Sequence, residues 1–174
     1  MNKQGGFTLV ELVVVIVILG ILSAIALPRF SGMQAEARLA KINGALGSLK
    51  SASTLAHGTQ LAILNSTNST SVTLEGKTIK MSNGYPTYDS VAVAAGIALA
   101  DVTGAGAQGD FYIVAATGGS VTIATDSNHT SCAVKYTEAA ANAQPTYNAN
   151  GTPSGAATPL TTLLATIPTV DDCR

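Results

Sequence analysis

Residues 5–28 read GGFTLVELVVVIVILGILSAIALP, and this stretch decides how the chain is organised. From Phe7 to Leu27 the residues are almost all apolar, and Glu11 is the only charged one. An α-helix of this length, at about 1.5 Å per residue, spans roughly 30 Å, which is the thickness of the hydrocarbon core of a bilayer. The sequence therefore predicts a membrane-spanning helix close to the amino terminus.

The six residues before this run form a short leader that contains Lys3 and ends in the small pair Gly5-Gly6. In an ordinary secretory signal, the small residues and the cleavage site follow the apolar region, whereas here they precede it. Cleavage after Gly6 would leave the apolar helix on the mature protein, with Phe7 as its new amino terminus. Because basic residues stay on the cytoplasmic side of a membrane, we expect the rest of the chain to face outward.

Glu11 needs an explanation of its own, because a carboxylate inside a bilayer helix is costly and normally has a specific partner. Once Phe7 is the amino terminus, Glu11 lies four residues along the helix, the spacing at which helical neighbours meet. Its carboxylate could pair with that amine, or with the amine of an adjacent subunit in a filament. A third interpretation places Glu11 near the lipid headgroups, where its side chain reaches water.

The motif of residues 5–28 resembles the class III signal of type IV pilins and of type II secretion pseudopilins. The resemblance covers only about residues 1–30 of the chain. It implies cleavage after Gly6 by a prepilin peptidase, N-methylation of Phe7, and a role for Glu11 in aligning subunits during assembly. It also implies an inner-membrane assembly platform as a partner. The chain would be the substrate of this processing and not an enzyme.

The helical pattern continues beyond Pro28. Small and apolar residues recur at steps of three and four and form one stripe, made of Leu39, Ile42, Leu46, Leu49, Ser53 and Ala56. We predict one helix from about Phe7 to about Leu64, followed by a polar Asn-Ser-Thr segment. Residues 7–28 would be its membrane or filament-core half, and residues 29–64 an amphipathic half that packs on the head.

Gly20 and Pro28 are weak points of this helix. Proline removes one backbone donor and crowds the carbonyl four residues earlier, and glycine lowers helix propensity. The resemblance to pilins implies that the helix loosens between these two positions when a filament forms. We therefore expect residues 20–28 to be helical in the membrane and non-helical in the filament.

Residues 65–174 are expected to form a globular head with a small antiparallel sheet, which makes the fold class α+β. Its elements are predicted in this order: a hairpin at 72–81 that turns at Glu75-Gly76, a turn at 83–86, a helix at 89–99 capped by Asp89 or Ser90, a loop at 104–109, and antiparallel strands at 111–114, 121–124 and 132–136. The segment 139–162 is rich in Ala, Asn, Pro and Thr and is predicted to be a loop.

The two cysteines, Cys132 and Cys173, both lie in the head. On an exported head we expect a disulfide, whereas a cytosolic head would keep both thiols reduced. A bridge would close a loop of about 40 residues and stabilise the head by roughly 4 kcal/mol in the chain-entropy model. Pilins end in a disulfide-bounded region of this kind. With residues 84–86 and 131–137, the head is most similar to mannose-sensitive hemagglutinin-type type IVa pilins.

The sequence indicates no catalytic, cofactor or metal site. Charged residues make up only 11% of the chain and its formal net charge is −1, so the subunit itself has no basic surface for nucleic acid. His57 and His129 have no cysteine or carboxylate at metal-ligand spacing and are interpreted as surface residues. Asp171-Asp172 is a weak signal for calcium, which binds six to eight oxygens.

These features predict a structural subunit of a bacterial type IV pilus. The precursor would sit in the inner membrane and the product in an extracellular helical filament of identical subunits. Adhesion, motility or DNA uptake would be properties of the assembled fibre. The alternative is a pseudopilin, a moving part of a type II secretion system, and the disulfide-bounded tail favours the pilus over it.

Overall fold

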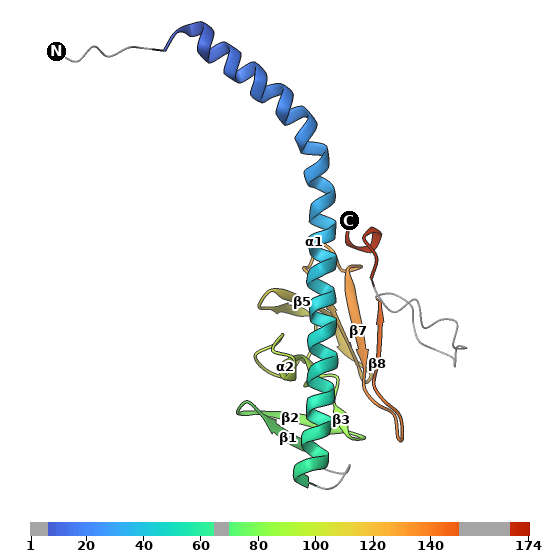
Figure 1. Cartoon of the computed structure of the whole chain (residues 1–174). Helices are drawn as coiled ribbons and strands as arrows, with labels where there is room; N and C mark the ends of the chain where they lie inside the picture. The colour runs from blue at the N-terminus through green and yellow to red at the C-terminus, as the bar shows by residue number, and fades with distance from the viewer. Residues whose placement is uncertain (1–6, 65–69, 150–167) are drawn as a thin grey trace, which may run out of the picture.

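A long helix carries a head made of two antiparallel sheets and one short helix (Figure 1). This computed structural model describes residues 7–64, 70–149 and 168–174, and for residues 27–31, 64 and 149 it describes the backbone alone. The observed architecture confirms the predicted α+β class, although the head contains two sheets where we predicted one.

The long helix, α1, runs from Leu9 to Leu64, within two residues of the predicted bounds. Figure 1 shows that its carboxyl-terminal half lies along the head, whereas its amino-terminal half bends away and projects freely. The helix continues through Gly20 and Pro28 without a break. Loosening of residues 20–28 in a filament stays a prediction.

The two halves of α1 differ in burial as the sequence pattern predicts. In the second half, Ile42, Leu49 and Ala56 are completely buried, and Leu46 and Ser53 nearly so. In the first half, the segment Leu9–Ala26 is long and apolar enough to cross a membrane, and none of it is buried in this chain. A water-exposed apolar surface of this extent indicates contact with lipid or with other chains.

The first sheet is formed by β1 (Ser71–Leu74), β2 (Lys77–Ser82) and β3 (Tyr85–Pro86), in that order. Glu75 and Gly76 connect β1 to β2 with φ angles of 48° and 77°, the backbone shape that suits a two-residue hairpin turn. The predicted hairpin is thus confirmed. The predicted turn at 83–86 is only half right: Asn83 and Gly84 turn, whereas the next two residues pair with β2.

The predicted helix at 89–99 is too long, because α2 spans only Val91–Ala94. Gly96, with φ of 70°, ends it: the N–H of Gly96 donates to the carbonyl of Val93, and the N–H of Ile97 to that of Ala92. This is the Schellman arrangement, in which a left-handed glycine closes the last turn of a helix.

Of the two predicted caps, Ser90 is the N-cap residue of α2, but its side chain makes no capping hydrogen bond. The hydroxyl of Ser90 instead accepts the backbone N–H of Lys80 at 3.0 Å. Asp89 pairs with the Lys80 ammonium at 2.9 Å, and Asp101 binds the same ammonium at 2.7 Å. Hydrogen bonds from Lys80 to Asp101 and Asp89 raise its pKa. Both candidate caps are therefore used to fasten this loop to β2.

The second sheet has five antiparallel strands in chain order. They are β4 (Gly106–Gln108), β5 (Phe111–Thr117), β6 (Ser120–Ala124), β7 (Ala133–Thr137) and β8 (Thr146–Ala149). The three central strands confirm the predicted meander. The two edge strands correct the prediction, because 104–109 and 139–162 were both expected to be loops. Their residues are mostly small or polar, and only pairing with a neighbouring strand makes them extended.

The core lies between α1 and the two sheets, and Tyr136 connects its parts. This side chain is completely buried, and its hydroxyl donates to the Pro86 carbonyl at 2.6 Å, which joins β7 of the second sheet to β3 of the first. Burial raises the pKa of Tyr136. Its ring meets that of Tyr147 edge to face at 5.5 Å between centroids.

Candidate assembly site

The helix α1 begins with a reciprocal cap that joins Thr8 to Glu11. Thr8 precedes the first helical residue, and its backbone N–H and its hydroxyl each donate to Oε2 of Glu11 at 2.8 Å. In return, the N–H of Glu11 donates to the Thr8 hydroxyl oxygen at 3.3 Å. This is a capping box, and it satisfies backbone donors that have no partner inside a helix. The Thr-x-x-Glu spacing is the sequence signal for this cap, which we did not predict.

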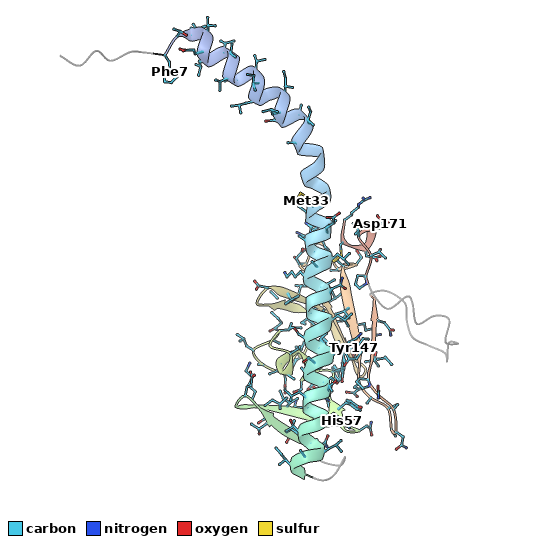
Figure 2. The ribbon with its side chains drawn as sticks, viewed as in Figure 1. Phe7, Met33, His57, Tyr147 and Asp171 are labelled. Atoms are coloured by element: carbon cyan, nitrogen blue, oxygen red, sulfur yellow. A yellow bond between two sulfur atoms is a disulfide. The ribbon has the colours of Figure 1, made fainter. Side chains whose placement is uncertain are left out.

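The other residues predicted for processing lie along the same helix. Phe7 stands at its free end with 93% of its surface exposed (Figure 2). Gly20 is exposed, and no described side chain or segment beyond the adjacent helix backbone lies close enough to contact a side chain at this position. Gly6 and the side chain of Pro28 lie outside the described residues. The roles predicted for these residues and for Glu11 stay predictions, because they require a peptidase or a neighbouring subunit.

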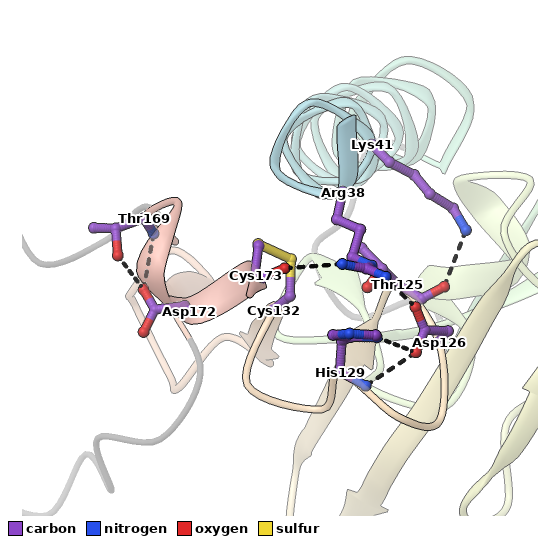
Figure 3. Close-up of a disulfide and its surroundings, with 9 residues drawn as sticks. All are labelled: Arg38, Lys41, Thr125, Asp126, His129, Cys132, Thr169, Asp172 and Cys173. Carbon is purple, nitrogen blue, oxygen red and sulfur yellow. Dashed lines mark hydrogen bonds and ion pairs between the residues drawn. A yellow bond between two sulfur atoms is a disulfide. The ribbon is translucent and has the colours of Figure 1, made fainter. Parts of the chain in front are cut away.

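The predicted disulfide between Cys132 and Cys173 is confirmed (Figure 3). Both residues are completely buried, and the bond ties the short carboxyl-terminal turn η2 (Asp171–Cys173) to the start of β7. Asp172 closes this turn, because its Oδ2 accepts the N–H and the hydroxyl of Thr169 at 2.8 and 2.7 Å. These hydrogen bonds lower the pKa of Asp172. Residues 150–167 of the enclosed loop lie outside the described residues.

Arg38 of α1 connects the helix to the same end of the head. Its Nη1 donates to the Cys173 carbonyl at 3.3 Å, and its Nε lies 3.7 Å from Oδ2 of Asp126 (Figure 3). The other oxygen of Asp126 accepts the backbone N–H of Asn128 and both the backbone N–H and Nδ1 of His129, at 2.7 to 2.9 Å. Burial raises the pKa of Asp126, but the hydrogen bonds from His129 and Asn128 outweigh it and lower that pKa overall. His129, which we interpreted as a surface residue, is therefore a half-buried part of a hydrogen-bonded turn.

Lys41 lies one turn of α1 further along and reaches two strand ends. Its ammonium donates to the backbone carbonyls of Asp110, at the β4–β5 turn, and of Thr125, just after β6, the latter at 2.9 Å. It also lies 4.9 Å from the ring centre of Phe111, within the range of a cation–π contact. Together with Arg38, it fastens α1 to three separate segments of the head.

His57 packs near the other end of α1 (Figure 2). Its Nδ1 lies 2.7 Å from the Gly84 carbonyl, so that this nitrogen carries a proton and donates. The imidazole ring stacks on the ring of Tyr85 at 4.3 Å between centroids, with 6° between the planes. The prediction of a simple surface histidine is corrected to a half-buried contact between α1 and the β2–β3 turn.

The adjacent acids of the carboxyl-terminal turn are engaged in local contacts. Asp171 lies 3.4 Å from Arg174, and Asp172 accepts from Thr169 as described above. Within residues 7–64, 70–149 and 168–174, no three His, Cys, Asp or Glu side chains gather where they could hold a metal ion. The described residues give the weak calcium signal no support.

Residues 1–27 match the family model described as the prokaryotic N-terminal methylation motif. Among characterised proteins, the chain is 53% identical over 60 residues to fimbrial protein EcpB of Eikenella corrodens, covering 33% of this chain and 38% of that one. It is 46% identical over 52 residues to the type IV major alpha-pilin of Moraxella bovis, covering 30% and 33%. The chain carries the amino-terminal signature of type IV pilins.

A third relative of this pilin-like chain is the type IV narrow pilus major component PilA5 of Thermus thermophilus, with 47% identity over 54 residues, covering 31% of this chain and 47% of that one. The matched segments thus span between a third and a half of these relatives. All three are described as fimbrial proteins, pilins or pilus components, and none as an enzyme. No solved structure matches the chain significantly. The likeness to mannose-sensitive hemagglutinin-type pilins receives no support from these comparisons.

Proposed function

We propose that this chain is a structural subunit of a bacterial type IV pilus that polymerises through α1. The observation that carries the proposal is the contrast within this helix. Its second half buries one face against the head, whereas no part of the chain that the structure describes covers the apolar segment Leu9–Ala26. An apolar helix of this length suits lipid before assembly and the packed centre of a filament afterwards. The methylation motif on the same segment supports this proposal.

The proposal includes a processing step and a division of the chain. A prepilin peptidase would remove residues 1–6 by cleavage after Gly6, and Phe7 would then be N-methylated. Residues 7–28 would form the membrane and filament-core half of the helix, 29–64 its amphipathic half, and 65–174 the head. The burial pattern supports the second boundary, because Ala35 is the first buried residue of α1 among those whose side chains the structure describes.

Identical subunits in a helical filament would be the main partners, with an inner-membrane platform as the site of assembly. The precursor would be anchored in the inner membrane and the product would be extracellular. Glu11 would align neighbouring subunits, and residues 20–28 would loosen as the filament forms. Adhesion, motility or DNA uptake would follow from the fibre and not from the single subunit.

The proposal is tested by shearing cells of the source bacterium and identifying the subunit of the released fibres by mass spectrometry. We expect this chain to dominate the fibres and to begin at a methylated Phe7. Fibres that lack it, together with a block in protein secretion when its gene is deleted, would instead indicate the pseudopilin alternative. A Glu11→Val variant should insert into membranes as well as the wild type but give few fibres, and a normal fibre yield would contradict the role of Glu11.

A further inference from the structure

Thr8 and Glu11 form a closed pair in which one atom of the carboxylate is used twice. Oε2 of Glu11 accepts both the backbone N–H and the hydroxyl of Thr8, and the Thr8 oxygen accepts the backbone N–H of Glu11 in return. Among the residues that the structure describes, Oε1 of Glu11 has no hydrogen bond or ion pair. The pair thus fixes the position of the carboxylate and leaves one of its oxygens available.

We propose that Thr8 is the positioning residue for Glu11 in filament assembly, an inference that rests on the proposed function. A glutamate side chain has several rotatable bonds, and ordering it costs free energy. When Thr8 holds the side chain in one conformation beforehand, less of that cost falls on the step in which a cationic group of a neighbouring subunit binds. The assembly determinant is then a pair of residues and not a single carboxylate.

The pair does not depend on the leader. Every donor and acceptor in it belongs to residue 8 or residue 11, so cleavage after Gly6 would remove none of them. The new amine would be on Phe7, the residue immediately before Thr8. The carboxylate is therefore already held when the mature amino terminus forms.

Substitutions at Thr8 distinguish this role from a general structural one. Valine has nearly the shape of threonine but has no hydroxyl, so Thr8→Val removes one hydrogen bond to Oε2 and the side-chain oxygen that accepts the Glu11 N–H. Serine keeps the hydroxyl, so Thr8→Ser should preserve the pair. Thr54→Val is the matched control, because Thr54 lies on the same helix and its exposed hydroxyl donates to the Lys50 carbonyl one turn earlier, at 2.9 Å.

The first measurement is the yield of sheared fibres relative to subunit in the membrane, for the full-length chain in a host that assembles it. We expect Thr8→Val to lower the yield roughly five-fold or more, the size of effect that loss of a helix cap produces. Thr8→Ser and Thr54→Val should stay within about two-fold of the wild type by the same reasoning. Wild-type yield from Thr8→Val, or failure of Thr8→Ser to assemble, would overturn the proposal.

A Glu11→Gln variant separates capping from charge. Glutamine can replace glutamate in a capping box but has no negative charge. If the pair serves to present a carboxylate, Glu11→Gln should retain the helix start and lose fibres. If its fibre yield equals that of the wild type, Glu11 is only a cap and the proposal is overturned.

The second measurement does not need fibres, so it separates failure of this proposal from failure of the proposed function. In detergent micelles, the amide hydrogen of Glu11 should exchange roughly five-fold faster in Thr8→Val than in the wild type or Thr8→Ser. Equal exchange rates in the three proteins would show that the pair does not form. Slow exchange in the wild type combined with no wild-type fibres would instead reject the pilus function and, with it, a role of Thr8 in assembly.

Discussion

Removing the disulfide should destabilise the head by an amount that follows from the length of chain it closes. Cys132 and Cys173 are 41 residues apart. In the chain-entropy model, a cross-link over that separation restricts the unfolded chain enough to stabilise the folded state by about 4 kcal/mol at 25 °C. We therefore expect the double variant Cys132→Ala/Cys173→Ala to lose about this much free energy of unfolding, a large part of the stability of a domain of this size.

The assay is urea unfolding of the full-length chain in detergent micelles, followed by tyrosine fluorescence, because the protein has no tryptophan and Tyr136 is buried in the core. The control is Asp171→Asn, since this exposed carboxylate forms a surface ion pair with Arg174 at 3.4 Å and its replacement should change the free energy of unfolding by less than about 0.5 kcal/mol. A loss below about 1 kcal/mol in the double variant would refute the reasoning. Such a small loss would mean that the carboxyl-terminal tail is not part of the cooperative unfolding of the sheet.

Three further predictions concern the core and the pH dependence of the head. Leu49→Ala should lower the free energy of unfolding by about 2–5 kcal/mol, because Leu49 is completely buried. Leu55→Ala, at a position that is 58% exposed, should change it by less than about 0.5 kcal/mol. The midpoints of urea unfolding check both predictions. Tyr136→Phe should lower the free energy of unfolding by about 1–3 kcal/mol in the same assay, because the buried carbonyl of Pro86 loses its hydrogen-bond donor. An unchanged urea midpoint would contradict the proposed link between the two sheets. The folded-state pKa of Asp126 is lowered, so its contribution to stability is present above the unfolded value of about 3.9 and is lost as the pH falls through the lower folded value. The free energy of unfolding should therefore fall less between neutral and strongly acid pH in Asp126→Asn than in the wild type. The same pH dependence in both proteins would count against these hydrogen bonds.

The long-range plan of the fold was predictable because its signals are strong and local. The apolar run and the periodic stripe through Ile42 and Leu49 predict both ends of α1 to within two residues, because together they extend over the whole segment. The hairpin was predictable because residues 72–81 alternate around Glu75-Gly76, and Gly76 readily adopts the positive φ angle that the turn needs. The disulfide was predictable because an exported head favours disulfides and the chain has only two cysteines to pair.

The errors arose where distant residues decide the local structure. The strand β4 has three residues, Gly106–Gln108, and becomes extended only because it pairs with β5. Ser90 is the N-cap residue of α2, as predicted, but its hydroxyl makes no cap because it accepts the backbone N–H of Lys80 in β2, whose ammonium pairs with Asp89. The Thr8–Glu11 cap differs from these cases, because its Thr-x-x-Glu signal is purely local and the cap was predictable from the sequence.

The contacts of Arg38 and Lys41 have a mechanical consequence. The apolar half of α1 leaves the head just before these residues, so tension on that half would reach the head at this level first (Figure 1). There it would be divided among the Cys173 carbonyl, the turn of Asp126 and the strand ends at Asp110 and Thr125. Because Cys173 is covalently bonded to the strand β7 through Cys132, the outermost of these attachments cannot peel away from the sheet. Under a pulling force, the contacts of Arg38 and Lys41 with the head would bear the load at the same time and would not break one after another.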